Sequence, residues 1–133
     1  MLPPRDVDSE LYHYGVKGMK WGVRRKQKKA ELRDKLARKL KQESKDNFKA
    51  SKIMKGLADE DKDNMYEDRE TYNLQIKGFS DAGKRYMESH KKLMAMDVNS
   101  VSKRQIKKEY WNAYNDATKL NFGLDVYDLV YNR

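Results

Sequence analysis

One repeat in this sequence constrains the fold more than any other feature. Over residues 65–93, mostly apolar and aromatic positions recur with gaps that alternate four and three. The positions are Met65, Arg69, Tyr72, Ile76, Phe79, Gly83, Tyr86, His90 and Leu93. Because this alternation places all of these side chains along one seam of an α-helix, it is typical of a helix packed along its length against another helix. The spacing therefore predicts a long helix over residues 60–96.

Two glycines interrupt this predicted helix. Gly78 and Gly83 each weaken a helix by roughly 1 kcal/mol relative to alanine, and a kink over residues 78–83 is compatible with them. Gly83 lies on the seam itself. A position without a side chain lets a large aromatic ring or a neighbouring backbone come close, so we expect tight packing at Gly83.

The segment before the seam predicts a second long helix, over residues 26–55. It is rich in Lys, Arg, Glu, Gln, Leu and Ala, and it contains neither glycine nor proline before Gly56, which we expect to end the helix. Its apolar stripe, which includes Leu32, Leu36 and Leu40, is one residue wide over most of its length. Such a helix requires another helix, a partner or a charged surface to lie on. The acidic residues 59–61 then favour the start of the next helix.

A third helix is predicted over residues 102–121. Ser102 is a suitable N-cap, and the apolar positions again alternate four and three around a small-residue centre at Ala113 and Ala117. Gly123 ends this helix. The tail at residues 124–131 is compatible with a short helix, a strand or a second docking peptide, and the short helix is favoured.

These elements predict an all-α protein, namely a long antiparallel helical hairpin or an open three-helix bundle with an irregular N-terminal arm. The arm comprises residues 1–25, and the helical domain comprises residues 26–133. The seams can close within one chain or between chains, which leaves a homo-oligomer open. The aromatic residues expected in the core or in oligomer contacts are Tyr72, Phe79, Tyr86, Tyr110, Trp111 and Tyr114.

The segment at residues 13–25, hereafter the docking box, has a composition that suits neither a helix nor a solvated charged face. It holds three glycines within eight residues, with large apolar side chains and cations between them. Glycine at this density indicates turns or a close backbone approach, Trp21 suits a partner's pocket, and the cations steer association. The alternative is an arm that packs on the following helices, with Trp21 filling a gap in the core. The residues expected to bind a partner are His13, Gly15, Val16, Lys17, Gly18, Met19, Lys20, Trp21, Gly22, Val23, Arg24 and Arg25.

The docking box also resembles a known sequence pattern. From His13 to Arg25 it matches H-x-G-V-K-G-M-K-W-G-V-R-R, a box found in many proteins of tailed phages and prophages, often within or beside head-morphogenesis genes. The box occurs on otherwise dissimilar proteins and is not a catalytic signature. The resemblance implies a structural or head-associated virion protein, with a phage head or other virion protein as its partner. It also implies a location in the virion and, during assembly, in the cytoplasm of the host bacterium.

Charge is distributed unevenly along the chain. Residues 11–55 carry 16 Lys and Arg against 4 Asp and Glu, whereas residues 56–76 carry 2 against 7. Such blocks are usually solvated helix faces, but they also pair within a hairpin or between subunits, or leave the basic side to face a polyanion. A basic helix of this kind can lie along a DNA or RNA backbone without reading its sequence. The residues expected to make those contacts are Lys26, Lys28, Lys29, Arg33, Lys35, Arg38 and Lys39.

Little catalytic chemistry is visible. The chain has no cysteine, and neither of its histidines, His13 and His90, belongs to a metal-ligand pattern. No run approaches the roughly 18 apolar residues of a membrane span. We therefore expect a non-enzymatic protein that docks through its box, without metal, cofactor or membrane contact. The alternatives are a sequence-tolerant nucleic-acid-binding internal virion protein and a small phage inhibitor of a host defence protein.

Overall fold

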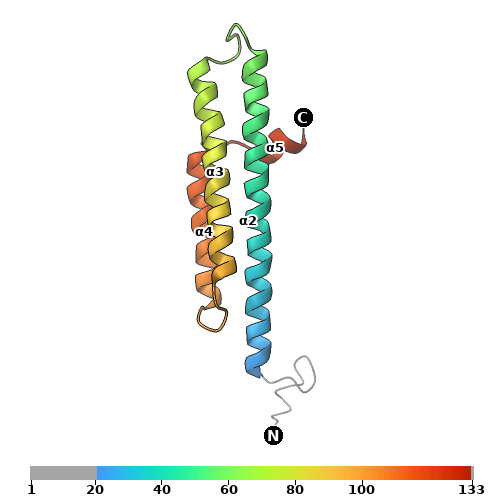
Figure 1. Cartoon of the computed structure of the whole chain (residues 1–133), viewed down its shortest axis with the longest axis vertical. Helices are drawn as coiled ribbons and strands as arrows, with labels where there is room; N and C mark the ends of the chain where they lie inside the picture. Colours follow the sequence, from blue (N-terminus) through green and yellow to red (C-terminus); the bar gives the residue numbers. More distant parts are fainter. Residues whose placement is uncertain (1–20, 133) are drawn as a thin grey trace.

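The computed structural model describes residues 21–132, and within this range the chain is helical and has no strand. The helices are α2 (Trp21–Glu60), α3 (Arg69–Ala95), α4 (Lys103–Leu120) and α5 (Val126–Tyr131). The long helices α2 and α3 form an antiparallel hairpin, α4 runs back along α3, and the short α5 lies against α2 (Figure 1). The predicted all-α bundle and the short C-terminal helix are confirmed.

The seam between α2 and α3 follows a strict heptad register. Four hydrogen bonds join a side chain of one helix to a backbone carbonyl of the other. They run from His90 Nδ1 to Ala37 O (2.7 Å), from Ser44 Oγ to Gly83 O (2.7 Å), from Ser51 Oγ to Ile76 O (2.9 Å) and from Arg69 Nη2 to Ala58 O (3.3 Å). Each step of seven residues along α2 is matched by a step of seven back along α3, so the two helices stay in phase over their whole contact.

The two glycines of α3 are points of close approach. A Cβ added at Gly83 would lie 3.0 Å from the ring of Phe48 on α2, and one added at Gly78 would lie 2.5 Å from the carbonyl oxygen of Leu120 on α4. The predicted approach of an aromatic ring at Gly83 is confirmed. Helix α3 is continuous through both glycines.

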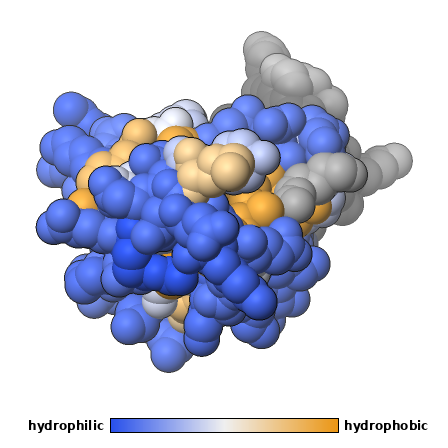
Figure 2. All heavy atoms as spheres, turned by 90° about the horizontal axis from the view of Figure 1, so that it is seen from above, coloured by the Kyte–Doolittle hydropathy of each residue, from blue (hydrophilic) through white to orange (hydrophobic). Residues whose placement is uncertain are grey.

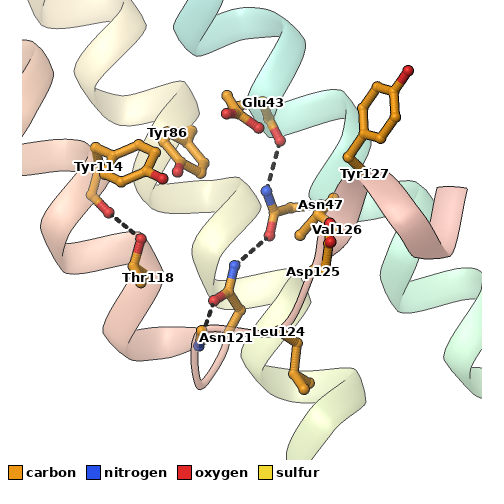
Figure 3. Close-up of a pocket in the computed structure, with 11 residues that line it drawn as sticks. Glu43, Asn47, Tyr86, Tyr114, Thr118, Asn121, Leu124, Asp125, Val126 and Tyr127 are labelled. Atoms are coloured by element: carbon orange, nitrogen blue, oxygen red, sulfur yellow. Dashed lines mark hydrogen bonds between the residues drawn. The ribbon is translucent and has the colours of Figure 1, made fainter. Parts of the chain in front are cut away.

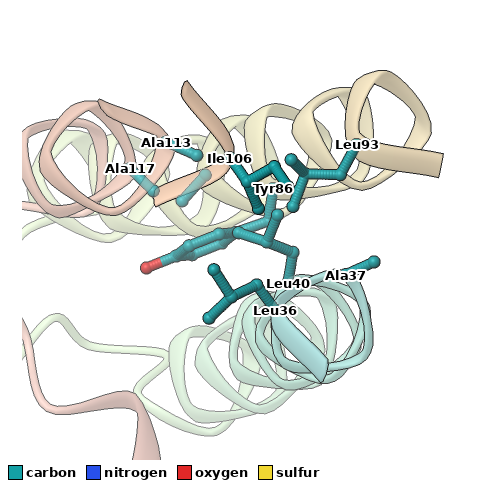
Figure 4. Close-up of a cluster of buried hydrophobic side chains, with 9 residues drawn as sticks. Leu36, Ala37, Leu40, Tyr86, Leu93, Ile106, Ala113 and Ala117 are labelled. Atoms are coloured by element: carbon teal, nitrogen blue, oxygen red, sulfur yellow. The ribbon is translucent and has the colours of Figure 1, made fainter. Parts of the chain in front are cut away.

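The core is narrow and is built by all three long helices (Figure 4). Its buried residues are Leu36, Ala37 and Leu40 of α2, Ala82, Tyr86 and Leu93 of α3, and Ile106, Ala113 and Ala117 of α4. The small residues at Ala113 and Ala117 allow α4 to pack closely on its neighbours. Seen from the end that carries the α2–α3 turn, the surface is mostly hydrophilic with small separated hydrophobic groups (Figure 2).

Of the six aromatic residues expected in the core or in oligomer contacts, four are buried or half-buried. Tyr72, Phe79 and Tyr86 are buried, and Tyr110 is half-buried. Trp111 is 54% exposed and Tyr114 is 39% exposed, because α4 has no further helix on its outer side. Met65, the first expected seam residue, is 76% exposed and lies in the turn before α3.

Three helix boundaries differ from those expected by five residues or more. Helix α2 begins at Trp21 rather than residue 26, and it passes through Gly56 to end at Glu60. The cost of roughly 1 kcal/mol for glycine is small beside the packing of the last turns, where Ala58 is fully buried. Conversely, α3 begins at Arg69 rather than residue 60. Of the acidic residues 59–61, which were expected to begin α3, Asp59 and Glu60 are the last residues of α2 and Asp61 lies in the connection.

Asp61 explains the late start of α3. Its carboxylate accepts hydrogen bonds from the backbone N–H groups of Met65, Tyr66 and Glu67 and from the hydroxyl of Tyr72. These hydrogen bonds hold residues 61–68 as a turn. Asp68 then caps α3 by accepting a hydrogen bond from the backbone N–H of Thr71. Burial acts to raise the pKa of the Asp61 carboxyl, but the four hydrogen bonds together lower it.

Helix α4 has the predicted N-terminus. Ser102 and Gln105 form a reciprocal capping box, in which each side chain binds the other residue's backbone N–H. After Leu120 the backbone takes positive φ at Phe122 (62°) and Gly123 (69°), which turns the chain towards α2. That turn seats α5 against α2 and directs Asn121 inward, where its Nδ2 donates to Asn47 Oδ1 at 3.0 Å.

Candidate functional site

The docking box is only partly described by the structure. Its residues 21–25 form the first turns of α2, which corrects the expectation that residues 1–25 as a whole form an irregular arm. Gly22 and Val23 are exposed, and a Cβ added at Gly22 would meet nothing within 4 Å. Outside the described residues lie His13, Gly15, Val16, Lys17, Gly18, Met19 and Lys20.

This end of α2 projects beyond the rest of the bundle (Figure 1). Two side chains tie this part of α2 to the α3–α4 loop: Arg33 Nη1 donates to Met96 O at 3.0 Å, and Lys29 Nζ donates to Val101 O at 2.9 Å. Towards the N-terminus from Lys29, every residue of 22–28 except the half-buried Arg24 is exposed. The described part of the docking box is therefore carried on a helical extension.

The cations predicted to bind nucleic acid divide into two groups. Lys29 and Arg33 are half-buried and hold the α3–α4 loop through the carbonyls of Val101 and Met96, so they serve the fold. The remaining predicted residues are exposed to solvent. They are Lys26, Lys28, Lys35, Arg38 and Lys39.

The structure also places a row of exposed cations further along α2. Arg38, Lys41, Lys45, Lys49 and Lys52 are all exposed, and their spacing of three, four, four and three residues places them on one face of α2. We call this face the basic ridge. It spans about 21 Å along the helix axis at 1.5 Å per residue. The spacing of these cations by three or four residues is visible in the sequence, and it could have identified this helix face.

The basic and acidic blocks do not pair across the α2–α3 hairpin within residues 21–132. The ion pairs that join two helices in this range run from Arg85 of α3 to Asp116 (3.0 Å) and Glu109 (3.9 Å) of α4. These partly exposed pairs tie α4 to α3. The cations of the basic ridge consequently keep their charge available to a partner.

A cavity of about 390 Å³, hereafter the acidic cavity, opens between α2, α3, α4 and α5 (Figure 3). Its lining contains two carboxylates, those of Glu43 and Asp125, and, among the described residues that form it, neither Lys nor Arg. The lining residues are Glu43, Asn47, Tyr86, Tyr114, Thr118, Asn121, Gly123, Leu124, Asp125, Val126 and Tyr127. A neighbouring cavity of about 480 Å³ shares Glu43 and Tyr127 and adds Tyr110 and Asp46.

Neighbouring groups shift the pKa values of the acidic cavity. Burial first, and the adjacent Asp46 second, raise the pKa of the Glu43 carboxyl. Burial, then the charge of Glu43, raise the pKa of the Tyr86 and Tyr110 hydroxyls above their ordinary value. These mutual effects place the carboxylate and the hydroxyls within electrostatic reach of one another.

Residues 21–132 contain no cluster of three or more His, Cys, Asp and Glu side chains placed to hold a metal ion. The one histidine in this range, His90, donates from Nδ1 to the Ala37 carbonyl, since a carbonyl can only accept. That contact is the ordinary packing role of a half-buried histidine. None of the helices in the described range is long and apolar enough to cross a membrane.

Comparison with known proteins concerns the N-terminus alone. A family model described as "Family of unknown function (DUF7211)" matches residues 4–28. The matched segment contains the docking box and ends within the projecting part of α2, before the first core residue. No curated protein and no solved structure is significantly similar to the chain.

Proposed function

We propose that this protein is a non-enzymatic, head-associated structural protein of a tailed phage, which docks on another virion component through residues 13–25. The observation that carries the proposal is the projection of the described part of the docking box beyond the contacts of Lys29 and Arg33. An exposed helix end at one extremity of the bundle can contact a partner without unfolding the core. The resemblance of the docking box to a phage sequence pattern supplies the virion context.

Two further observations support a docking role. The family model ends at residue 28, before Leu36, the first buried core residue in the described range. The core cluster of the described residues spans Leu36 to Ala117, and none of residues 22–28 belongs to it. An element that recurs at the N-terminus and is not required by the core is suited to binding a partner.

The docking role is tested by incorporation into particles. Trp21→Ala removes the expected anchor, and an aromatic anchor at the centre of an interface typically contributes about 2 kcal/mol or more, so incorporation should fall by at least about tenfold. The matched control is Trp111→Ala, which removes an exposed tryptophan from α4. Incorporation of the Trp21 variant at the level of the unchanged protein would refute the docking role.

A second function is favoured by the basic ridge: sequence-tolerant binding of DNA or RNA. A straight row of exposed cations on one helix face can follow a phosphate backbone, and the affinity of such contacts falls steeply with salt. The five ridge residues predict a slope of log K against log salt of about −4.5 for double-stranded DNA, if every cation neutralises one phosphate.

Charge neutralisation distinguishes the two functions. Changing Lys45, Lys49 and Lys52 together to Gln should reduce that slope by nearly 3 and leave incorporation through the docking box unchanged. The control changes three exposed cations of α3 and α4, Lys84, Lys107 and Lys108, to Gln. If both triple variants lose DNA binding equally, binding depends on net charge alone and the basic ridge has no specific role.

A further inference from the structure

The acidic cavity contains polar groups that the fold leaves without partners. Tyr86 is 3% exposed, and its hydroxyl makes no hydrogen bond within the part of the chain that the structure describes. Figure 4 shows the ring inside the core cluster and the hydroxyl pointing out of it, on the side where the acidic cavity lies. The hydroxyl oxygen is not among the buried unpartnered atoms of the described residues and borders the cavity, so it is accessible to a ligand there.

Glu43 adds a carboxylate to the same cavity. Its carboxylate is half-buried and, among residues 21–132, it takes part in no ion pair or side-chain hydrogen bond. Burial and the adjacent Asp46 raise the pKa of this carboxyl, so its charged form is disfavoured there, although Lys39 lines the adjoining cavity. A cation in the acidic cavity would favour the charged form.

The neighbouring groups define which cation fits. Besides the carboxylate, the cavity offers the hydroxyl oxygens of Tyr86 and Tyr114, and Tyr110 lies within electrostatic reach. Oxygen acceptors around one carboxylate match the three N–H donors of an ammonium group. The tyrosine rings provide apolar and π surface for the alkyl chain and the charge.

We propose that the acidic cavity is a binding site for a primary ammonium group, held by the Glu43 carboxylate and the hydroxyls of Tyr86 and Tyr114. The volume of about 390 Å³ admits an alkylamine of a few carbons or the end of a lysine side chain. The chain as a whole is strongly basic, with a formal net charge of +9, so this acidic lining is local and specific.

The experiment titrates the full chain with n-butylammonium chloride, followed by calorimetry and by amide chemical shifts. n-Butanol, which has the same chain without the charge, is the ligand control. We expect saturable binding of butylammonium, shifts confined to residues that line the acidic cavity, and binding of butanol at least about tenfold weaker. Equal binding of the two ligands, or shifts elsewhere, would overturn the proposal.

Variants locate the site. Glu43→Gln should weaken butylammonium binding by at least about tenfold, whereas Glu31→Gln, which changes an exposed carboxylate of the same helix, should leave it unchanged. Tyr114→Phe removes one hydroxyl from a partly exposed ring, so the fold is preserved and binding should weaken severalfold. Unchanged binding in both Glu43→Gln and Tyr114→Phe would overturn the assignment.

The source of the ammonium group is distinguished with a blocked lysine. If α-N-acetyl-lysine N-methylamide binds at least as tightly as butylammonium, the acidic cavity accepts a lysine side chain of a polypeptide. If only butylammonium binds, the cavity takes a free amine. Either result supports an ammonium site, and failure of both ligands to bind refutes it without bearing on the docking box.

Discussion

The close approach of α4 to Gly78 gives the sharpest test of the packing. Replacing a helix-interior glycine with alanine ordinarily stabilises a helix by roughly 1 kcal/mol. At Gly78 the new Cβ would lie 2.5 Å from the Leu120 carbonyl oxygen and 3.2 Å from the Phe122 ring. The first of these atoms belongs to the backbone, so it cannot rotate out of the way. Either α3 or the end of α4 must move.

The magnitude follows from two opposing terms. Overpacking of a well-packed site costs about 1–3 kcal/mol, and the helix propensity returns roughly 1 kcal/mol. Gly78→Ala should therefore lower the free energy of unfolding by about 0–2 kcal/mol. Gly56→Ala is the matched control, because Gly56 is also helical and a Cβ there would meet nothing within 4 Å. That control should gain roughly 1 kcal/mol.

The two variants are compared with the unchanged protein by urea unfolding, followed by circular dichroism at 222 nm. The expected difference in unfolding free energy between Gly56→Ala and Gly78→Ala is about 1–3 kcal/mol. If Gly78→Ala stabilises the protein as much as Gly56→Ala, α4 does not approach α3 as described. The same result would remove the reason for glycine at this position.

Three further changes probe the polar contacts. Asn121→Ala leaves the buried Oδ1 of Asn47 without its donor and should cost about 1–3 kcal/mol in urea unfolding, whereas Asn115→Ala on the exposed face should change little. The hydrogen bonds to Asp61 lower its pKa below the ordinary 3.8, so its contribution to stability is present above that value and lost as pH falls through the lower folded value. Asp61→Asn should therefore flatten the acid limb of a thermal-stability profile, and an unchanged acid limb would contradict the described turn. Ser102→Ala removes the cap of α4 and should cost roughly 1 kcal/mol, measurable in the same unfolding assay.

Much of the fold could be predicted because local signals and packing agree. The four-three repeat of the second long helix, the N-cap at Ser102 and the small centre of the third helix each act within a few turns. The expectation of an aromatic ring at Gly83 was correct for the same reason. A seam position without a side chain leaves room for a neighbour whichever helix supplies it.

Other features required the tertiary structure. Nothing local distinguishes Lys29 and Arg33 from the exposed cations around them, yet they bind carbonyls more than sixty residues away in sequence. The role of Asp61 was likewise hidden, because an acidic residue beside a helix terminus favours a helix start wherever it stands. Its capture of three backbone N–H groups depends on how the turn folds.

The sequence by itself determined the helical class and the four-three repeat of α3, because periodicity, caps and composition are properties of short segments. The tertiary structure decided where α2 begins and ends, which cations remain exposed on the basic ridge, and that Glu43 and Tyr86 line one cavity. These outcomes arise from contacts between residues far apart in the chain. Each depends on the relative placement of whole helices, which no local pattern encodes.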